Sequence, residues 1–338
     1  MKICVQCILP ETFPGITFNQ QGICNHCQLS AEKMVKLEED KRKYAAKFHD
    51  LLEQLRQSDA HRLRTYDVLM AYSGGKDSTY TLAMLKEKYG LRILAVSFDN
   101  GFLSAQAVEN IRKVTDELGV DQIFFKPRWD LLKIIFSTAA KRELYPKKTL
   151  ERASTICTSC MAIVKTVCLK MALEQNIPMI GYGWSPGQAP VQSAIMRTNP
   201  ALYKMTQQSV VGPLREVAGD AILAYFLNDQ HFAEPEKFPW NVHPLAWEHY
   251  DEGLILKEIE KYGWRAPQDT DSNSTNCLLN AFANEVHVKR YNFHPYVWEI
   301  ANMVREGVMS RGEGCKKFEQ SVPDSWIAPV KEKLGLSG

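Results

Sequence analysis

Nine consecutive residues near the first quarter of the chain have the composition of a phosphate-binding loop. They are Ala71, Tyr72, Ser73, Gly74, Gly75, Lys76, Asp77, Ser78 and Thr79. The two glycines can adopt positive φ, so that successive backbone N–H groups converge on one anion. The lysine adds a positive charge, and the aspartate offers a carboxylate to Mg²⁺. We expect this loop to bind ATP; a glycine-rich turn that binds nothing is the alternative.

The segments on either side of the loop explain how it would be held. Residues 67–70 are apolar and of strand type, and residues 80–88 have helical spacing and good helix formers. The loop therefore joins a strand to a helix that begins at Ser78 or Thr79, and a helix N-terminus favours negative charge. The Walker pattern Gly-x-x-x-x-Gly-Lys-Ser/Thr is absent, so the predicted phosphate cradle is of another kind.

The string Ser-Gly-Gly-x-Asp-Ser, at residues 73–78, resembles the signature of the PP-loop ATP pyrophosphatases, an adenine nucleotide alpha-hydrolase-like superfamily. The resemblance implies a HUP-like fold and cleavage of ATP between its α and β phosphates. It implies that AMP is transferred to a substrate oxygen while pyrophosphate stays in the loop. Lys76 and Asp77 would then be catalytic residues.

The rest of the central region alternates between two kinds of segment. Strand-type runs at 91–98, 122–125 and 177–183 are interleaved with helical runs at 104–118 and 131–141. This alternation predicts an α/β fold with a mostly parallel, doubly wound sheet. Ligands bind at the carboxyl ends of such strands, which adds Asp99 and Gly181 to the expected ATP site. Asp99 is equally compatible with an ordinary turn.

Four cysteines close to the N-terminus have the spacing of a metal site. Cys4, Cys7, Cys24 and Cys27 form the pattern C-x2-C-x16-C-x2-C, which is typical of four-thiolate zinc. A segment this short has no core of its own, so bound Zn²⁺ would supply its folding energy. We predict a structural zinc ribbon; an iron–sulfur cluster and four free thiols are the alternatives.

A second group of cysteines lies farther along the chain. Cys157 and Cys160 begin a helical segment, where two thiols of low pKa would share one side, and Cys277 stands in the polar run 271–277. A redox dithiol, ligands of a cluster and inert packing all stay open. The pattern resembles PP-loop tRNA thiolation enzymes, and this resemblance implies that the three cysteines hold a [4Fe-4S] cluster with one iron free to carry sulfide.

Two functions follow from these patterns. In the first, a substrate oxygen is adenylated and then replaced by sulfur from a sulfur donor. The substrate would be a tRNA base or a small phosphate-bearing metabolite, since the basic run 141–148 adjoins Cys157.

The second function comes from the N-terminus, where residues 4–18 and 22–27 resemble N-acetyl sugar amidotransferases. That resemblance implies a nucleotide sugar substrate and an amidine formed with ammonia from a separate glutaminase subunit. The C-x-x-C at residues 157–160 is not part of that family's pattern.

The amino-acid composition narrows the class of protein and its expected location. The 338 residues are 45% hydrophobic and 24% charged, as expected of a folded globule, and the net charge of +2 is too small to predict a nucleic-acid partner by itself. No signal-peptide pattern or uninterrupted transmembrane-length apolar run is present, so we expect a cytoplasmic protein without a membrane partner. Nine cysteines in that compartment indicate metal or redox chemistry. A homodimer is compatible with these features.

Four regions are predicted. They are a zinc ribbon at 1–28, a linking helix at 29–64, a PP-loop ATP pyrophosphatase domain at 65–228, and an irregular loop with a helical C-terminal region at 229–338.

Overall fold

A six-stranded sheet forms the centre of the molecule in the computed structural model, which describes residues 1–271, 273–319 and 322–336. Five positions of the predicted C-terminal region, residues 272, 320, 321, 337 and 338, lie outside the described residues. The sheet has the order β3-β2-β1-β4-β6-β5. Its strands are β1 (Val68–Ala71), β2 (Ile93–Phe98), β3 (Asp121–Phe125), β4 (Met179–Tyr182), β5 (Ile195–Arg197) and β6 (Trp240–Val242).

The neighbouring strands pair in parallel except β5, which is antiparallel to β6. The predicted α/β class with a mostly parallel sheet is therefore confirmed. Ala71 at the end of β1 pairs with Val96 of β2 and with Tyr182 of β4. The carboxyl ends of these three strands consequently meet at one edge of the sheet.

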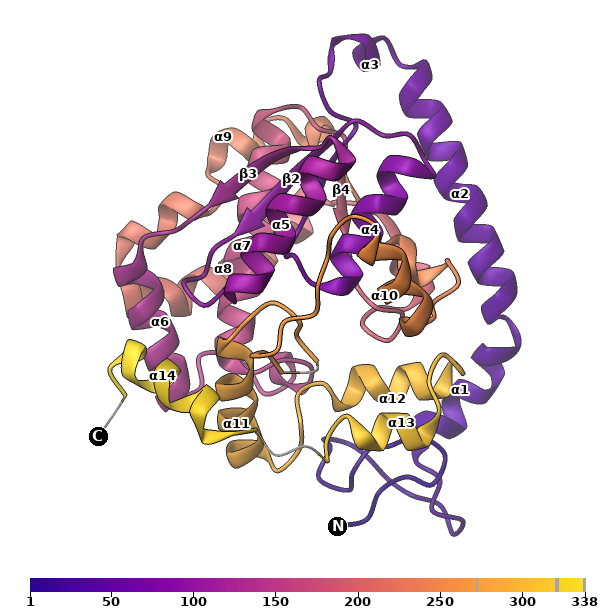
Figure 1. Cartoon of the computed structure of the whole chain (residues 1–338), viewed down its shortest axis with the longest axis vertical. Coiled ribbons are helices and arrows are strands. Elements are labelled where there is room, and N and C mark those ends of the chain that lie inside the picture. Colours follow the sequence, from indigo (N-terminus) through magenta and orange to yellow (C-terminus); the bar gives the residue numbers. More distant parts are fainter. Residues whose placement is uncertain (272, 320–321, 337–338) are drawn as a thin grey trace.

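Helices cover both faces of the sheet, because alternate residues of a strand point to opposite sides. Val68 and Met70 pack in one apolar cluster with α4 (Lys76–Glu87) and α5 (Ala105–Leu118), whereas Leu69 packs in another with α7 (Thr155–Glu174). Figure 1 shows α4 and α5 in front of the strands. Helices α6 (Trp129–Lys141) and α8 (Pro200–Ala218) pack beside α7.

Helix α7 is long and apolar enough, by length and composition, to cross a membrane. Half of the window that meets this test is buried inside the protein, and the helix contacts β1 and β4. Core helices of soluble proteins meet the same test.

The N-terminal region differs from the prediction in one respect. The single helix expected at 29–64 is divided into α1 (Asn25–Val35), α2 (Leu37–Gln57) and α3 (Asp59–Leu63). Residue Ser58 separates the last two because its backbone is extended, with φ −72° and ψ 139°. The apolar face of α2 is buried at Phe48, Leu51 and Leu52, as its spacing predicts.

The C-terminal region is helical, as expected. Among its described residues the α-helices are α9 (Asp229–Phe232), α10 (Glu252–Glu260), α11 (Leu279–Tyr291), α12 (Val297–Arg305), α13 (Arg311–Lys316) and α14 (Asp324–Leu334). In Figure 1 the N-terminal ribbon lies beneath α12 and α13. The Arg311 guanidinium donates hydrogen bonds to the carbonyl oxygens of Cys4 and Cys7, at 3.1 and 2.9 Å. The N-terminal ribbon and α13 are thus joined.

Candidate active site

The glycine loop takes a conformation that side chains would prevent. Gly74 has φ +76°, and a Cβ at this position would lie 2.6 Å from Ile111 Cγ1. Helix α4 begins directly after the loop at Lys76, two residues earlier than the sequence indicates. The Thr79 hydroxyl donates to the Gly75 carbonyl oxygen at 2.9 Å, and the Ser73 and Ser78 hydroxyls are 3.0 Å apart. The loop and the positive end of α4 therefore face the same space.

Lys76 is surrounded by acceptors. Its Nζ lies 3.0 Å from the Asp77 carboxylate, 3.0 Å from the Tyr250 hydroxyl and 3.9 Å from Glu252. Burial opposes the charged form of Lys76, but the charges of its neighbours outweigh burial and raise its pKa. The lysine is therefore an ammonium ion at neutral pH, as binding of phosphate requires.

A distant segment packs on top of the glycine loop. The backbone N–H of Lys76 donates to Thr275 Oγ1 at 3.2 Å, and a Cβ at Gly75 would lie 3.2 Å from the same oxygen. Residue Cys277 forms an antiparallel bridge with Leu103, after β2. The loop at 273–277 is thereby fixed between the glycine loop and the segment that follows β2.

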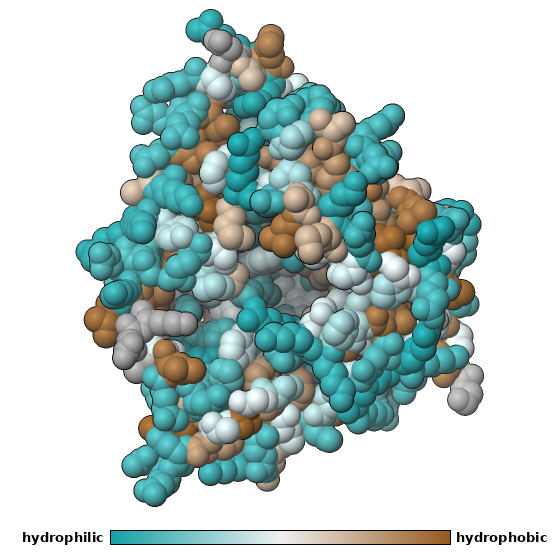
Figure 2. All heavy atoms as spheres, turned by 180° about the vertical axis from the view of Figure 1, so that it is seen from behind, coloured by the Kyte–Doolittle hydropathy of each residue, from teal (hydrophilic) through white to brown (hydrophobic). Residues whose placement is uncertain are grey.

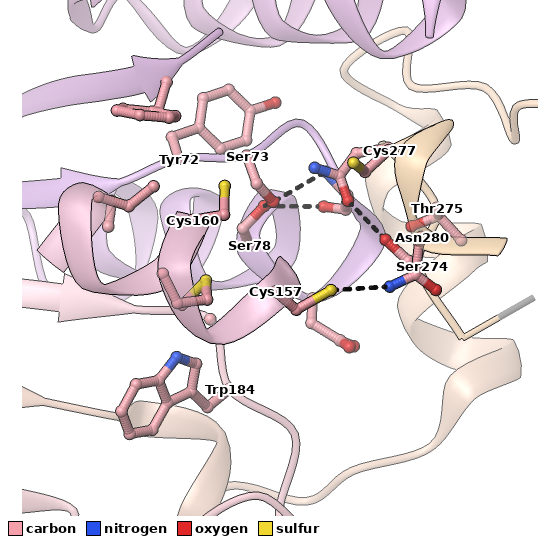
Figure 3. A pocket seen from close by; sticks show the side chains of 18 of the residues that line it. Tyr72, Ser73, Ser78, Cys157, Cys160, Trp184, Ser274, Thr275, Cys277 and Asn280 are labelled. Atoms are coloured by element: carbon pink, nitrogen blue, oxygen red, sulfur yellow. Dashed lines mark hydrogen bonds between the residues drawn. The ribbon is translucent and has the colours of Figure 1, made fainter. Parts of the chain in front are cut away.

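The three cysteines of the second group converge on one place. Helix α7 starts after Ser154, whose hydroxyl accepts from the Cys157 N–H, so that Cys157 and Cys160 lie in its first turns. The Asn100 side-chain amide donates to Cys277 Sγ at 3.4 Å and to Cys160 Sγ at 3.7 Å. The Asn280 amide lies 3.9 Å from Cys157 Sγ (Figure 3). The Asn100 amide thus links a sulfur of α7 to the sulfur of the 273–277 loop, whereas the Asn280 amide contacts Cys157 alone.

The expectation of low thiol pKa values is wrong. Burial raises the pKa of Cys157 to about 11, and it also raises the pKa values of Cys160 and Cys277. The start of α7 does not offset this loss of solvation. The thiols are therefore protonated at neutral pH in the protein without a bound metal.

A cavity of about 300 Å³ joins the two groups of residues. Seven residues of the predicted ATP site line it, namely Ala71, Tyr72, Ser73, Gly75, Lys76, Asp77 and Ser78. Cys157, Cys160 and Cys277 line the same cavity. Gly74 and Thr79 belong to the loop but lie outside the lining. Figure 2, which shows the molecule from behind, has a hollow near its centre within a mainly hydrophilic face.

Asp99 and Gly181 lie outside the lining of this cavity. The Asp99 carboxylate accepts from the Gly101 N–H at 2.8 Å and is 3.3 Å from Lys126 Nζ, which is the geometry of a turn residue. Gly181 is part of β4, where a Cβ would lie 3.0 Å from Leu85 of α4. The cavity is lined instead by Asn100 and Gly183, which follow these positions closely.

Several cavity residues were missed from the sequence. They are Asn100, Trp184, Gln188, Thr275, Asn280 and Tyr296. Asn100 could have been found, because it follows β2 at the carboxyl edge of a parallel sheet. Thr275 and Asn280 flank Cys277 in the chain, yet polar residues near a cysteine carry no specific pattern.

The N-terminal cysteines form a separate cluster. The four Sγ atoms lie within 4.8 Å of one another and all four residues are buried. Cys4 Sγ is 3.8 Å from Cys27 Sγ, and Cys7 Sγ is 3.8 Å from Cys24 Sγ. Tetrahedral zinc with Zn–S bonds of about 2.3 Å separates its sulfurs by about 3.8 Å, so this donor set fits Zn²⁺. None of these cysteines lines the cavity, as expected of a structural site.

Comparison with known proteins adds distant likenesses. No protein-family model matches the chain. The chain is 25% identical over 335 residues to the uncharacterized protein MJ1599 of Methanocaldococcus jannaschii. The alignment covers 99% of this chain and 98% of the relative.

Among solved structures, two that resemble this chain have TM-scores below 0.4. The U34-tRNA thiolase NcsA from Methanococcus maripaludis with its [4Fe-4S] cluster is 17% identical, with a TM-score of 0.37, over 95% of this chain and 90% of that chain. The NMN synthetase from Francisella tularensis is 12% identical, with a TM-score of 0.38, over 84% of this chain and 98% of that chain. The function proposed for this chain therefore depends on its own residues.

Proposed function

We propose that this protein is an ATP-dependent sulfur-inserting enzyme. It would adenylate a substrate oxygen, release pyrophosphate, and then replace the oxygen with sulfur in a tRNA base or a small phosphate-bearing metabolite. One observation carries the proposal: the glycine loop and three cysteines from two distant segments line a single cavity. The oxygen that is adenylated is bonded to the carbon that sulfur attacks, so both steps need one carbon–oxygen group in place, and a shared cavity meets this geometric demand.

The glycine loop supplies the groups that the first step needs. Backbone N–H groups at the start of α4 and the Lys76 ammonium would bind the β and γ phosphates, which leave as pyrophosphate. The Asp77 carboxylate would hold Mg²⁺, which neutralises charge on the leaving group. The Lys76 ammonium donates hydrogen bonds to the Asp77 carboxylate and to the Tyr250 hydroxyl, so the phosphates of ATP would compete with these two acceptors for Lys76.

The three thiols fit an iron–sulfur cluster better than a redox pair. A dithiol needs only Cys157 and Cys160, whereas the Asn100 amide contacts Cys160 and Cys277 together. Amides that donate to thiolate sulfurs stabilise their negative charge and tune a cluster's potential. Cys157, Cys160 and Cys277 would hold a [4Fe-4S] cluster whose remaining iron has no protein ligand, and the chemistry it would supply is the binding of exogenous sulfide. The sulfide-level sulfur would displace AMP, which would leave with the substrate oxygen and without any change of oxidation state.

Apolar side chains complete the cavity. Phe98, Leu103 and Val164 line it together with the cysteines. An acyl-type adenylate is hydrolysed by water, so apolar walls would protect it until sulfur reacts. In this arrangement the chain's own tasks are to bind ATP, to align the acceptor and to exclude water.

The test of the first step is pyrophosphate release from ATP in the presence of tRNA from a thiolation-deficient strain. We expect Asp77→Ala to lower the rate by at least about 10²-fold, as for loss of an electrostatic catalytic group. Asp116→Asn, on the exposed face of α5, is the control and should retain the wild-type rate. An Asp77→Ala variant with wild-type turnover would remove the loop from the mechanism.

The second step is tested by iron content and by mass spectrometry of the acceptor. After anaerobic reconstitution, Cys277→Ser should lose iron and stop incorporating sulfur. Cys168→Ser changes another cysteine of α7, which is buried and does not line the cavity, and should behave as wild type. If Cys277→Ser keeps both iron and sulfur insertion, the cluster proposal fails, and amidine formation with ammonia from a separate glutaminase becomes the better reading of the ATP site.

A further inference from the structure

A second cavity of about 210 Å³ lies next to the first. Its walls come from α7, from the end of β4, and from strands β5 and β6, which extend the sheet beyond the ATP-binding half. Tyr182 and Trp184 line both cavities. The second cavity therefore shares a wall of two aromatic side chains with the candidate active site.

Lys165 places an amine in this cavity without an opposing charge. Its Nζ lies 4.5 Å from the centroid of the Trp184 ring. Within residues 1–271, 273–319 and 322–336, no carboxylate forms an ion pair with it, and burial lowers its pKa. Lys165 is half-buried, so its ammonium is partly desolvated without a counter-ion, and an anion that enters the cavity would gain a cationic partner.

His243 provides a second group with unused hydrogen-bonding capacity. Its side chain is 4% exposed and stacks on Trp184 with ring centroids 4.2 Å apart. Its Nδ1 is buried and has no hydrogen-bond partner in the part of the chain that the structure describes. Burial, with the Lys165 charge, lowers the His243 pKa to about 3, so the ring is neutral at neutral pH. A neutral imidazole can donate one N–H without adding charge.

We propose that the second cavity binds a compact oxyanion, a carboxylate or phosphate group of a small molecule, with Lys165 as its cationic partner and His243 as a hydrogen-bonding partner. A cavity lined by aromatic rings and a lysine that lies against one of them suits one charged group attached to a small organic body. At about 210 Å³ the second cavity is smaller than the first, which has about 300 Å³.

The site also bears on the acceptor. Helix α7 carries Cys157 and Cys160 toward the first cavity and Lys165 toward the second. An acceptor whose oxyanion is held at Lys165 would lie against the wall shared with the candidate active site. This assignment to the acceptor rests on the proposed function, whereas oxyanion binding itself does not.

The experiment is an NMR titration of the full chain with sodium acetate and, separately, with inorganic phosphate. The glycine loop is first saturated with α,β-methylene ATP, so that added phosphate does not report on that loop. The observed signal is the indole N–H of Trp184, assigned by its loss in Trp184→Phe. We expect saturable shifts with at least one probe, and the responding probe tells carboxylate from phosphate.

Lys165→Met removes the charge but keeps a stem of similar length, and we expect binding at least about tenfold weaker, as for loss of a charge-assisted hydrogen bond. Lys165→Arg should bind within a few-fold of wild type, and His243→Phe should bind more weakly while the stacking on Trp184 is kept. Lys204→Met is the control, because this exposed lysine pairs with Asp229 outside the cavity. Circular dichroism checks that each variant is folded.

The proposal is overturned if neither probe shifts the Trp184 signal, or if Lys165→Met binds as well as wild type. Neither outcome involves turnover of ATP. If the protein binds acetate but releases no pyrophosphate, the oxyanion site stands and the proposed function is rejected. If it releases pyrophosphate but binds neither acetate nor phosphate in the second cavity, the proposed function stands and the oxyanion site is rejected.

Discussion

The Lys76 backbone N–H and the Thr275 hydroxyl form a 3.2 Å hydrogen bond between positions 199 residues apart. This bond attaches the loop that carries Cys277 to the first residue of α4. A phosphate bound at the start of α4 would take the same N–H, so the bond is available to report on nucleotide binding.

Replacement of Thr275 tests that relationship. Thr275→Val keeps the shape of the side chain and removes the acceptor, so we expect the free protein to lose about 1 kcal/mol of stability. Thr275→Ser should stay close to wild type. Saturating ATP should narrow the difference between the variants, since phosphate satisfies the same donor; melting temperatures with and without ATP measure this. An equal difference in both conditions would show that the N–H stays on Thr275.

The close approach of β4 to α4 gives a second prediction. A Cβ at Gly183 would lie 2.6 Å from the Ser78 backbone nitrogen, so Gly183→Ala must displace the start of α4. We expect weaker ATP binding, by at least about tenfold, measured by calorimetry, because displaced N–H groups no longer converge on phosphate.

Gly212→Ala is the matched control for this substitution. It lies in α8, where its added Cβ would have no atom of another element within 4 Å, so it should leave ATP affinity unchanged. Equal ATP affinity of the Gly183→Ala variant and wild type would show that the loop tolerates a methyl group there.

The ribbon prediction concerns metal content. Purified protein should hold about one zinc per chain at the four N-terminal cysteines, and Cys24→Ser should release it and lower the melting temperature, because metal supplies the ribbon's folding energy. Cys315→Ser, which lies outside both cysteine groups, should keep the metal. Iron in place of zinc, lost with Cys24→Ser, would contradict the assignment.

A pH dependence follows from Glu306, which is half-buried after α12. Burial raises the pKa of its carboxyl group from 4.5 to about 7, against the opposing effect of Lys41 and Arg305. Between pH 4.5 and about pH 7 the folded protein keeps a proton on Glu306 that the unfolded chain has lost. The free energy of unfolding therefore falls as the pH rises through this window.

Glu306→Gln removes this ionisation. We expect the variant to gain stability relative to wild type at pH 8 and to gain less at pH 5, as measured by urea denaturation. Glu260→Gln, at an exposed position in α10, should show no such difference between the two pH values. If the difference in unfolding free energy between Glu306→Gln and wild type is the same at pH 5 and pH 8, the Glu306 carboxyl group ionises normally.

Local patterns predict the central fold well because they are set by nearby residues. The strand before the glycine loop, the helix after it and the alternation that follows have strong periodic signals, and β1, α4, β2 and α5 lie within a few residues of the predictions. The four-thiolate cluster is equally local, since its pattern fixes the ligands before the chain folds.

Other features depend on contacts across the chain. Strands β5 and β6 are three residues each and lie in segments whose composition is that of loops, so their pairing exists only once β4 is in place. Asn100 and Asn280 gain their roles from cysteines that are 60 and 123 positions away. The error about thiol pKa has the same origin, because helix position is visible in a sequence and burial at a cavity is not.

The hydrogen bonds from Arg311 to the carbonyl oxygens of Cys4 and Cys7 bear on how the protein is made. Cys7 and Cys4 precede Arg311 by 304 and 307 positions, so the ribbon is translated well before the helix that completes its surroundings. During translation Phe13 lacks its stacking partner Trp298, and the metal-binding cysteines lack Arg311. We therefore expect the ribbon to mature only after α13 has been translated, so a chain truncated before α12 should leave Phe13 exposed to chaperones.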